Sequence, residues 1–468
     1  MPRKYLIIGI VVLVLMALVT WYGIVSSGKK NADGTKAPVT LSDFFPFGKG
    51  SGQNTGTTTP ATTTGDATGT SSSTPTTTSL PKLRQISSSP VAGGIAFSRV
   101  RPILVKTDTV PVETAPAPTA TTTPAPKTPT KKTAVKTPPV PTETVTAVRY
   151  VERATAHVYE TVMEDNKETR VSNTTIPRIA EAFFGNNGDS LILRYLKDDN
   201  QTIETFTGAI IPPPPVATTQ DGTPVVETFG MLKGTFLPEN IRSLAVSPDT
   251  TKIVYVSDTP DGSVITSALF DGTKRAQILR SPFSEWTLSW PGTLLMTATT
   301  KPSGSANGYA YSISQKNGIL QKLLGNIAGL TTLASPNGKL ILYGASRANG
   351  TTLSLYDSVA GKSYALGLNT LPEKCVWSKD STAAYCGSSD QVPAGLYPDA
   401  WYQGLVSFND NLWKISIGKN STATQMLAEP VTVAGKSLDV STPFIDDLGH
   451  YLFFINKNDS MLWSLDLR

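Results

Sequence analysis

Short runs of alternating hydrophobic and polar residues, separated by tight turns, occupy the chain from about residue 82 onward. One block occurs at 246–255 and again at 334–343, where Ser-Pro-Asp or Ser-Pro-Asn precedes an apolar run that ends in Tyr; a looser copy lies at 377–385. Proline sets the backbone φ of the first turn position, and Asp or Asn hydrogen-bonds to its own backbone. Each block therefore predicts a strand, a tight turn and a second strand.

The blocks belong to a repeat of roughly forty residues. Repeat units lie at 241–282, 286–327 and 330–368, with an interrupted unit from 375 and an earlier one at 177–237. A unit of short strands cannot bury its hydrophobic face alone and stacks against its neighbours. The pattern therefore predicts an all-β propeller built of four-stranded blades.

The two ends of this region complement each other. The last unit, at 444–467, has only three strands, and residues 82–87 provide a matching outer strand before an inner-strand pattern at 91–98. A strand from each end closes the ring and removes an exposed edge. With 91–173 as the first blade, we count seven blades in a propeller that spans 82–468, with six or eight blades as the alternatives.

Two low-complexity stretches interrupt this organisation, at 48–80 (Thr, Ser and Gly) and at 107–146 (Thr and Pro). Such segments bury too little apolar surface to offset the entropy of ordering them. We therefore expect a disordered stalk at 26–81 and a disordered insertion at 107–146 within the first blade.

An uncharged apolar run extends from Leu6 to Val25. At ~1.5 Å per residue it is long enough to cross a ~30 Å hydrocarbon layer, so it predicts a transmembrane helix at 6–25 after a short inside tail at 1–5. A cleaved signal peptide is the alternative. Either interpretation, followed by the Thr/Ser/Pro-rich stalk, places the propeller on the extracytoplasmic side of a cell membrane.

The charge is unevenly divided. Through residue 148 there are 15 Lys+Arg and 6 Asp+Glu, and after it 26 and 30, which together make the 41 and 36 of the chain. A nucleic-acid-binding protein concentrates positive charge on its folded domain, so nucleic acid is not an expected partner. The basic tether either contacts anionic lipid or wall polymer or simply keeps the linker soluble.

Cysteine and histidine are scarce. Cys375 and Cys386 flank a turn near Asp380, so they form a cross-strand disulfide if the register suits it, and otherwise a reduced buried pair. His157 and His450 lie far from these cysteines, which argues against a structural zinc site. The chain has no phosphate loop or other cofactor motif, so we expect neither metal nor cofactor.

The Ser-Pro-Asp/Asn blocks at 247 and 335, each followed by an apolar strand with Tyr, resemble TolB-like propellers. The architecture is also similar to WD-repeat propellers, although the Trp-Asp and Gly-His signatures are absent. The resemblance covers roughly 82–468. It implies a rigid, usually non-catalytic platform that binds proteins or envelope components.

The long insertion at 387–411 is the strongest candidate for a partner-binding site. It connects the second and third strands of its blade and is rich in aromatic residues, which provide large, stiff contact areas. The alternative is that these aromatics pack down as a plug over the channel. The candidate residues are Tyr397, Asp399, Trp401, Tyr402 and Phe408.

Together these features predict a membrane-anchored scaffold at the cell envelope that binds a protein or an envelope polymer. The chain lacks the G-x-S-x-G elbow of serine hydrolases, and a catalytic constellation is not recognisable, so we do not expect an enzyme. The alternative function is an envelope glycan hydrolase that uses channel-facing carboxylates, for which the candidates are Asp390, Asp399 and Asp410.

Overall fold

The computed structural model describes residues 81–103, 141–213, 217–218, 224–225, 229–293, 295–348, 350–419 and 421–468. The predicted inside tail at 1–5, the transmembrane helix at 6–25, the stalk up to residue 80 and most of the insertion at 107–146 lie outside the described residues. Within the described ranges, none of the helices has the length and hydropathy that a membrane span requires.

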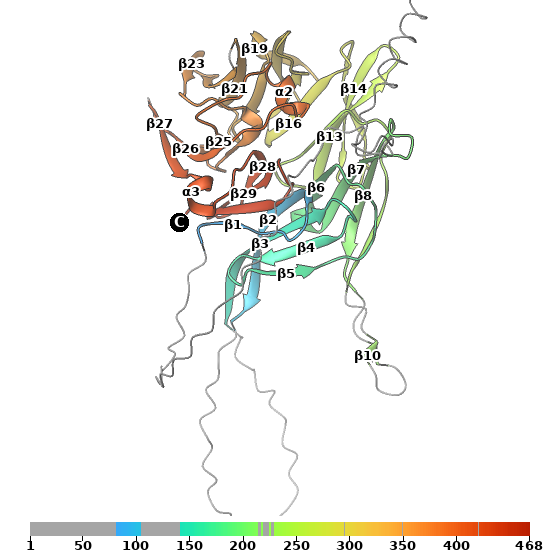
Figure 1. Cartoon of the computed structure of the whole chain (residues 1–468). Helices are drawn as coiled ribbons and strands as arrows, with labels where there is room; N and C mark the ends of the chain where they lie inside the picture. The colour runs from blue at the N-terminus through green and yellow to red at the C-terminus, as the bar shows by residue number, and fades with distance from the viewer. Residues whose placement is uncertain are drawn as a thin grey trace, which may run out of the picture. The chain divides into compact units, whose positions relative to one another are not determined.

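The described residues form seven four-stranded antiparallel sheets around a central channel, which confirms the predicted seven-bladed propeller (Figure 1). From the inner to the outer strand, blade 1 contains β2 (Val91–Pro102), β3 (Thr142–Glu152), β4 (Val158–Val162) and β5 (Lys167–Arg170). Blade 2 contains β6 (Glu181–Gly185), β7 (Ser190–Leu196), β8 (Ile203–Ile211) and β11 (Met231–Phe236), with a small hairpin of β9 (Ala217–Thr218) and β10 (Pro224–Val225) between its last two strands.

The next three blades follow the repeat units. Blade 3 contains β12 (Ser243–Val246), β13 (Lys252–Thr259), β14 (Gly262–Leu269) and β15 (Ala276–Ser281). Blade 4 contains β16 (Trp286–Gly292), β17 (Leu295–Thr300), β18 (Asn307–Ile313) and β19 (Leu320–Ala328). Blade 5 contains β20 (Thr331–Ala334), β21 (Leu340–Arg347), β22 (Gly350–Asp357) and β23 (Lys362–Ala365).

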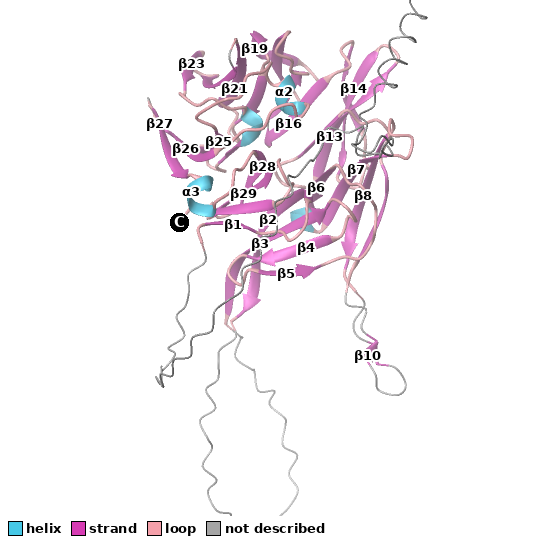
Figure 2. Ribbon diagram, viewed as in Figure 1, coloured by secondary structure: helices cyan, strands magenta, loops and turns pink. Residues whose placement is uncertain are grey.

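The last two blades carry most of the short helices (Figure 2). Blade 6 contains β24 (Cys375–Trp377), β25 (Ala383–Ser388), β26 (Asn411–Ile417) and β27 (Thr422–Ala428). Blade 7 contains β28 (Val440–Ile445), β29 (Tyr451–Asn456), β30 (Leu462–Asp466) and, as its outer strand, β1 (Leu83–Gln85). The helices are the 3-10 turns η2 (Asn186–Gly188) and η3 (Pro372–Lys374) and the short helices α2 (Asp399–Tyr402) and α3 (Pro430–Ala434).

The ring closes as predicted, because β1 from the N-terminal side pairs with β30 from the C-terminal side. Leu83 lies opposite Leu465, and the Ile86 amide donates to the Leu462 carbonyl at 2.7 Å. Leu83 and Ile86 are both buried. In Figure 1 the blue strand β1 lies beside the red strands of blade 7. β1 therefore covers the edge that β30 would otherwise expose.

The repeated serine of the Ser-Pro-Asp/Asn blocks organises the turn between the first two strands of its blade. In blade 3 the Ser247 hydroxyl accepts a hydrogen bond from the Lys252 amide at 2.9 Å. Ser335 accepts the Leu340 amide at 3.1 Å in blade 5, and Ser378 of blade 6 makes the equivalent bond. A serine hydroxyl thus satisfies a backbone donor that the tight turn leaves unpaired.

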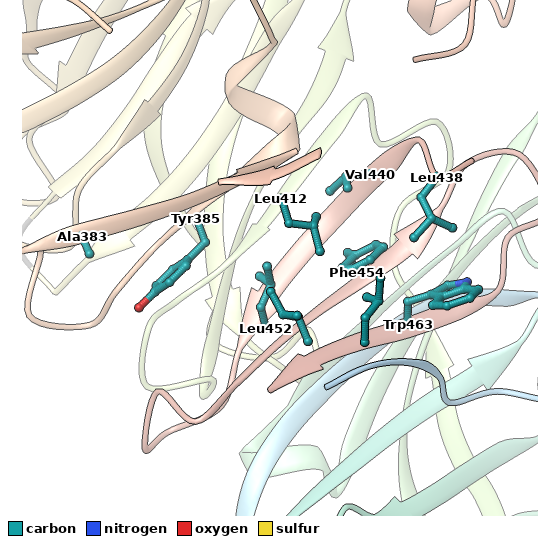
Figure 3. Close-up of a cluster of buried hydrophobic side chains, with 10 residues drawn as sticks. Ala383, Tyr385, Leu412, Leu438, Val440, Leu452, Phe454 and Trp463 are labelled. Carbon is teal, nitrogen blue, oxygen red and sulfur yellow. The ribbon is translucent and has the colours of Figure 1, made fainter. Parts of the chain in front are cut away.

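The hydrophobic core lies between neighbouring blades. Figure 3 shows one such layer, where Tyr385 and Leu412 of blade 6 face Leu452, Phe454 and Trp463 of blade 7. Similar clusters occupy the other described interfaces between blades. Each sheet buries its apolar face only against the next sheet, which explains why the repeats are stable as a ring.

Two faces of the ring can be defined from the topology. We call the upper face the one that carries the turns between the second and third strands of each blade and the connections between blades. The lower face carries the remaining turns.

The Thr/Pro-rich insertion of blade 1 begins and ends on the lower face. Its expected boundaries, 107–146, need correction, because residues 142–146 belong to β3 and pair with 98–102 of β2. This ladder extends the hairpin despite the low-complexity composition.

Candidate functional site

The insertion between β25 and β26, at 389–410, lies on the upper face and reaches beyond its own blade. Asp399, in α2, accepts a hydrogen bond from the Gly304 amide of blade 4 at 2.6 Å. The Tyr397 carbonyl lies so close to Gly304 and Gly329 that a Cβ at either position would approach it to 2.5 Å. The insertion therefore packs tightly against the loops around blade 4, and only glycine permits this contact.

Three of the predicted aromatic residues form a buried cluster beneath the insertion. Tyr397, Trp401 and Phe408 are at most 6% exposed and pack together with Leu371. The rings of Tyr397 and Phe408 meet edge to face at 5.7 Å, and the Tyr397 hydroxyl donates to the Pro393 carbonyl at 2.6 Å. These buried contacts are the kind expected if the aromatics pack inward, as in the plug alternative, rather than contact a partner.

A fully buried ion cluster lies directly under these aromatics. The Lys374 ammonium, at the end of η3, contacts one oxygen of Asp410 at 2.7 Å and one oxygen of Asp439, and it donates to the Val440 carbonyl at 3.1 Å. The lysine and both carboxylates are at most 1% exposed. Asp410 directly precedes β26 of blade 6, and Asp439 directly precedes β28 of blade 7. The cluster therefore connects the insertion to the interface between these two blades.

Trp401 connects the aromatic cluster to the ion cluster. Its indole N–H donates to both carboxylate oxygens of Asp439 at 3.0 Å. The ammonium groups of Lys374 and Lys457 lie 5.0 and 4.2 Å from the centre of its ring, within the range of cation–π attraction. Lys457 also donates to the Trp401 carbonyl. Removing this side chain would leave a buried carboxylate without one of its donors.

The electrostatics of the cluster follow from its burial. Desolvation raises the pKa of Asp410 to about 6, although the nearby Lys374 charge acts in the opposite direction. Burial also lowers the pKa of Lys457. One oxygen of Asp410 has no hydrogen-bond partner among the described residues, which fits the raised pKa of this carboxyl.

The exposed half of the insertion presents a different surface. Tyr402 is 45% exposed, and Leu396 and Leu405, at 48% and 73%, are exposed as well. The Tyr402 hydroxyl donates to the half-buried carboxylate of Glu373. Burial of the hydroxyl end and the charge of Glu373 raise the pKa of Tyr402, and desolvation raises the pKa of Glu373. This hydrogen bond holds the tyrosine ring at the surface.

The structure thus brings the five predicted residues together but assigns them different environments. Tyr397, Trp401 and Phe408 face the interior, where a partner does not reach them in this conformation, while Tyr402 is exposed and Asp399 is half-buried. Leu396 and Leu405 lie within the predicted insertion but were not among the predicted residues. Lys374 and Asp439 were not predicted either, because a lysine or aspartate that precedes a strand has no signal in the sequence for burial.

The carboxylates of the hydrolase alternative all have structural partners. Asp390 accepts a hydrogen bond from Asn411 at 3.2 Å, Asp399 is bound by Gly304, and Asp410 belongs to the ion cluster. The two cavities along the channel are lined by other residues. Among the described residues, no group of three or more His, Cys, Asp or Glu side chains is arranged to hold a metal ion.

Cys375 and Cys386 lie directly opposite each other on β24 and β25 and form a disulfide. Their Cα atoms are 4.1 Å apart, the short spacing that is typical of a pair without ladder hydrogen bonds. The spacing of the two cysteines in the sequence was compatible with either a disulfide or a reduced pair. The turn at 378–382 sets it.

Neither a family model nor a curated protein matches the chain. Among solved structures, TolB from Acinetobacter baumannii aligns with 69% of this chain and 76% of its own, at 14% identity and a TM-score of 0.37. An oligogalacturonate lyase in complex with manganese aligns with 69% and 85%, at 11% identity and a TM-score of 0.41. A putative TolB from Agrobacterium tumefaciens aligns with 47% and 76%, at 10% identity and a TM-score of 0.32. TolB structures are thus among the structural neighbours of the seven-bladed propeller that the described residues form.

Proposed function

We propose that this protein is a binding scaffold of the cell envelope, anchored to the membrane through residues 6–25, which holds a protein partner on the upper face of its propeller. The observation that carries the proposal is the insertion at 389–410. Its inner half is fixed by the aromatic and ion clusters, and its outer half presents Leu396, Tyr402 and Leu405 to solvent.

A surface of this kind suits protein recognition. Because the insertion is held in place before a partner arrives, little conformational entropy is lost on binding. Tyrosine and leucine supply apolar contact area, and tyrosine is enriched among the residues that dominate binding energy. An envelope polymer is the alternative occupant of the same surface.

The location on the extracytoplasmic side has two supports. Disulfides such as Cys375–Cys386 persist in oxidising compartments and are rare in the cytosol. The apolar run at 6–25 is long enough for a membrane span. Both agree with a propeller that is held outside the cytoplasm by the stalk.

The proposal is tested by capture from envelope extracts of the host with the full chain. The variant Tyr402→Ser with Leu405→Ser removes two of the three exposed side chains, and Val359→Ser, 76% exposed in a turn on the lower face, is the matched control. Quantitative mass spectrometry should find one set of proteins that the double variant loses and the control retains. Equal capture by all three proteins would contradict the proposal, and capture of polymer without protein would favour the alternative occupant.

A further inference from the structure

A cavity of about 460 Å³ lies among the inner strands of blades 7, 1, 2 and 3, next to the channel. Its volume is within the range of small-molecule sites. The walls are largely apolar and include Ile95, Ala182, Phe184 and Phe444 from β2, β6 and β28. The cavity is therefore suited to an apolar body of small-molecule size.

The backbone is strained at Thr442 in the wall of this cavity. Thr442 and Pro443 form a β-bulge in β28, since Ser441 pairs with Ile455 and Phe444 with Phe453, which leaves two residues opposite one. Thr442 has a φ of 45°. A positive φ is a true outlier for a β-branched residue, and such strain gathers at ligand sites.

Thr250 also lines the cavity and has a φ of 58°, but its positive φ belongs to the repeated turn. The equivalent positions, Gly338 and Ser381, have φ values of 72° and 62° and do not line the cavity. The strain at Thr442 has no counterpart of this kind in the repeated turn, and strain of this kind is found at ligand sites.

A guanidinium with free donors lines the same cavity. Arg153, in the turn between β3 and β4 on the upper face, is half-buried and donates one N–H to the Ser460 hydroxyl at 3.1 Å. Within the described part of the chain, Arg153 makes no ion pair, and its other N–H groups have no partner. Glu181, which also lines the cavity, is already bound by Arg194.

Lys457 adds positive potential at the same end of the cavity, but its charge has a counterpart. The ammonium lies against Trp401, beside the buried cluster of Lys374, Asp410 and Asp439, whose formal charge is −1 when both carboxyls are ionised. Arg153 is therefore the group that an incoming anion would neutralise. A single planar guanidinium matches a carboxylate, which it can bind through two parallel hydrogen bonds.

We propose that this cavity binds a monocarboxylate with an apolar body, its carboxylate on Arg153 and its apolar part against Ala182, Phe184 and Phe444. Two sources share this chemistry: an acyl-chain carboxylate and the free C-terminus of an apolar peptide. The site uses none of the exposed residues at 396–405, so its failure would leave the proposed partner surface untouched.

The test is calorimetric titration of the full chain with two matched pairs of probes, with titration into protein-free buffer subtracted. The first pair is octanoate and octanamide, and the second is N-acetyl-trileucine with a free or an amidated C-terminus. At least one acid should bind tenfold or more tightly than its amide. Which acid binds identifies the source. The absence of binding by all four probes, or equal affinities of acids and amides, would overturn the proposal.

Three variants separate recognition from folding. Arg153→Met should reduce the affinity for the acid to that for the amide, whereas Arg178→Met, which removes an exposed guanidinium paired with Asp198, should leave it unchanged. Thr442→Gly should raise the melting temperature because it releases strain, yet weaken binding because the wall of the cavity relaxes. An equal loss with Arg178→Met, or a Thr442→Gly variant that is less stable than the wild type, would count against the site.

Discussion

The contrast between Trp401 and Tyr402 tests how the insertion is held. The two residues are neighbours in α2, but Trp401 is 6% exposed and Tyr402 is 45% exposed. Trp401 packs on Leu371 and Phe408 and shares its single N–H between the two oxygens of the buried Asp439 carboxylate. Trp401→Ala should therefore lower the free energy of unfolding of the domain strongly, while Tyr402→Ala should mainly change its surface.

The magnitudes follow from these contacts. Truncation of a buried tryptophan to alanine costs about 3–5 kcal/mol, and the loss of the N–H donor to a buried carboxylate places Trp401→Ala at the upper end of that range. Tyr402→Ala loses half-exposed ring area and the donor to Glu373, whose other oxygen is buried without a partner among the described residues, so its cost should be about 1–3 kcal/mol. The free energies of unfolding should differ by about 2–4 kcal/mol between the two variants.

Denaturant unfolding followed by far-ultraviolet circular dichroism measures this difference without relying on tryptophan fluorescence. Trp401→Phe is the intermediate case, because it keeps most of the ring volume and loses the N–H donor to Asp439. Its stability should fall between those of the wild type and Trp401→Ala. Equal, small losses for Trp401→Ala and Tyr402→Ala would refute the reasoning and return Trp401 to the exposed surface of the insertion.

Three further predictions concern closure, pH and redox state. Deleting residues 82–88 should lower the unfolding free energy by several kcal/mol, because blade 7 loses β1. A seven-residue deletion at 60–66, the control, should leave it unchanged. Equal denaturation midpoints for the two deletions would contradict the closure of the ring by β1. Burial raises the folded-state pKa of Asp410 from 3.8 to about 6, so stability from this group is complete below 3.8 and is lost as the pH rises to about 6. The difference in unfolding free energy between wild type and Asp410→Asn should shrink over that pH window. A difference that stays constant with pH would show that the titration of Asp410 does not cause the pH dependence. Reduction of Cys375–Cys386, which closes a loop of 11 residues, should cost about 3 kcal/mol, and an unfolding curve unaffected by dithiothreitol would show that the bond contributes nothing.

Much of the fold follows from local patterns that the sequence displays directly. The alternation of apolar and polar residues and the Ser-Pro-Asp/Asn turns predicted the strands of blades 3 and 5, because a strand of period two and a turn with proline are decided within a few residues. Ring closure was predictable because a three-stranded last blade leaves an edge that a matching strand at 82–87 can pair.

The site depended on contacts that no local pattern encodes. Trp401 is buried because Leu371, Phe408 and the Asp439 carboxylate of blade 7 meet it, and Lys374 is buried because two carboxylates from other segments neutralise it. The cavity near Arg153 likewise requires the inner strands of four blades. The sequence by itself thus determined the blades and their closure, which depend on local hydrogen bonding and period. Only the tertiary structure decided which aromatic and charged side chains face solvent, because burial is a property of the segments that converge on a residue rather than of the residue itself.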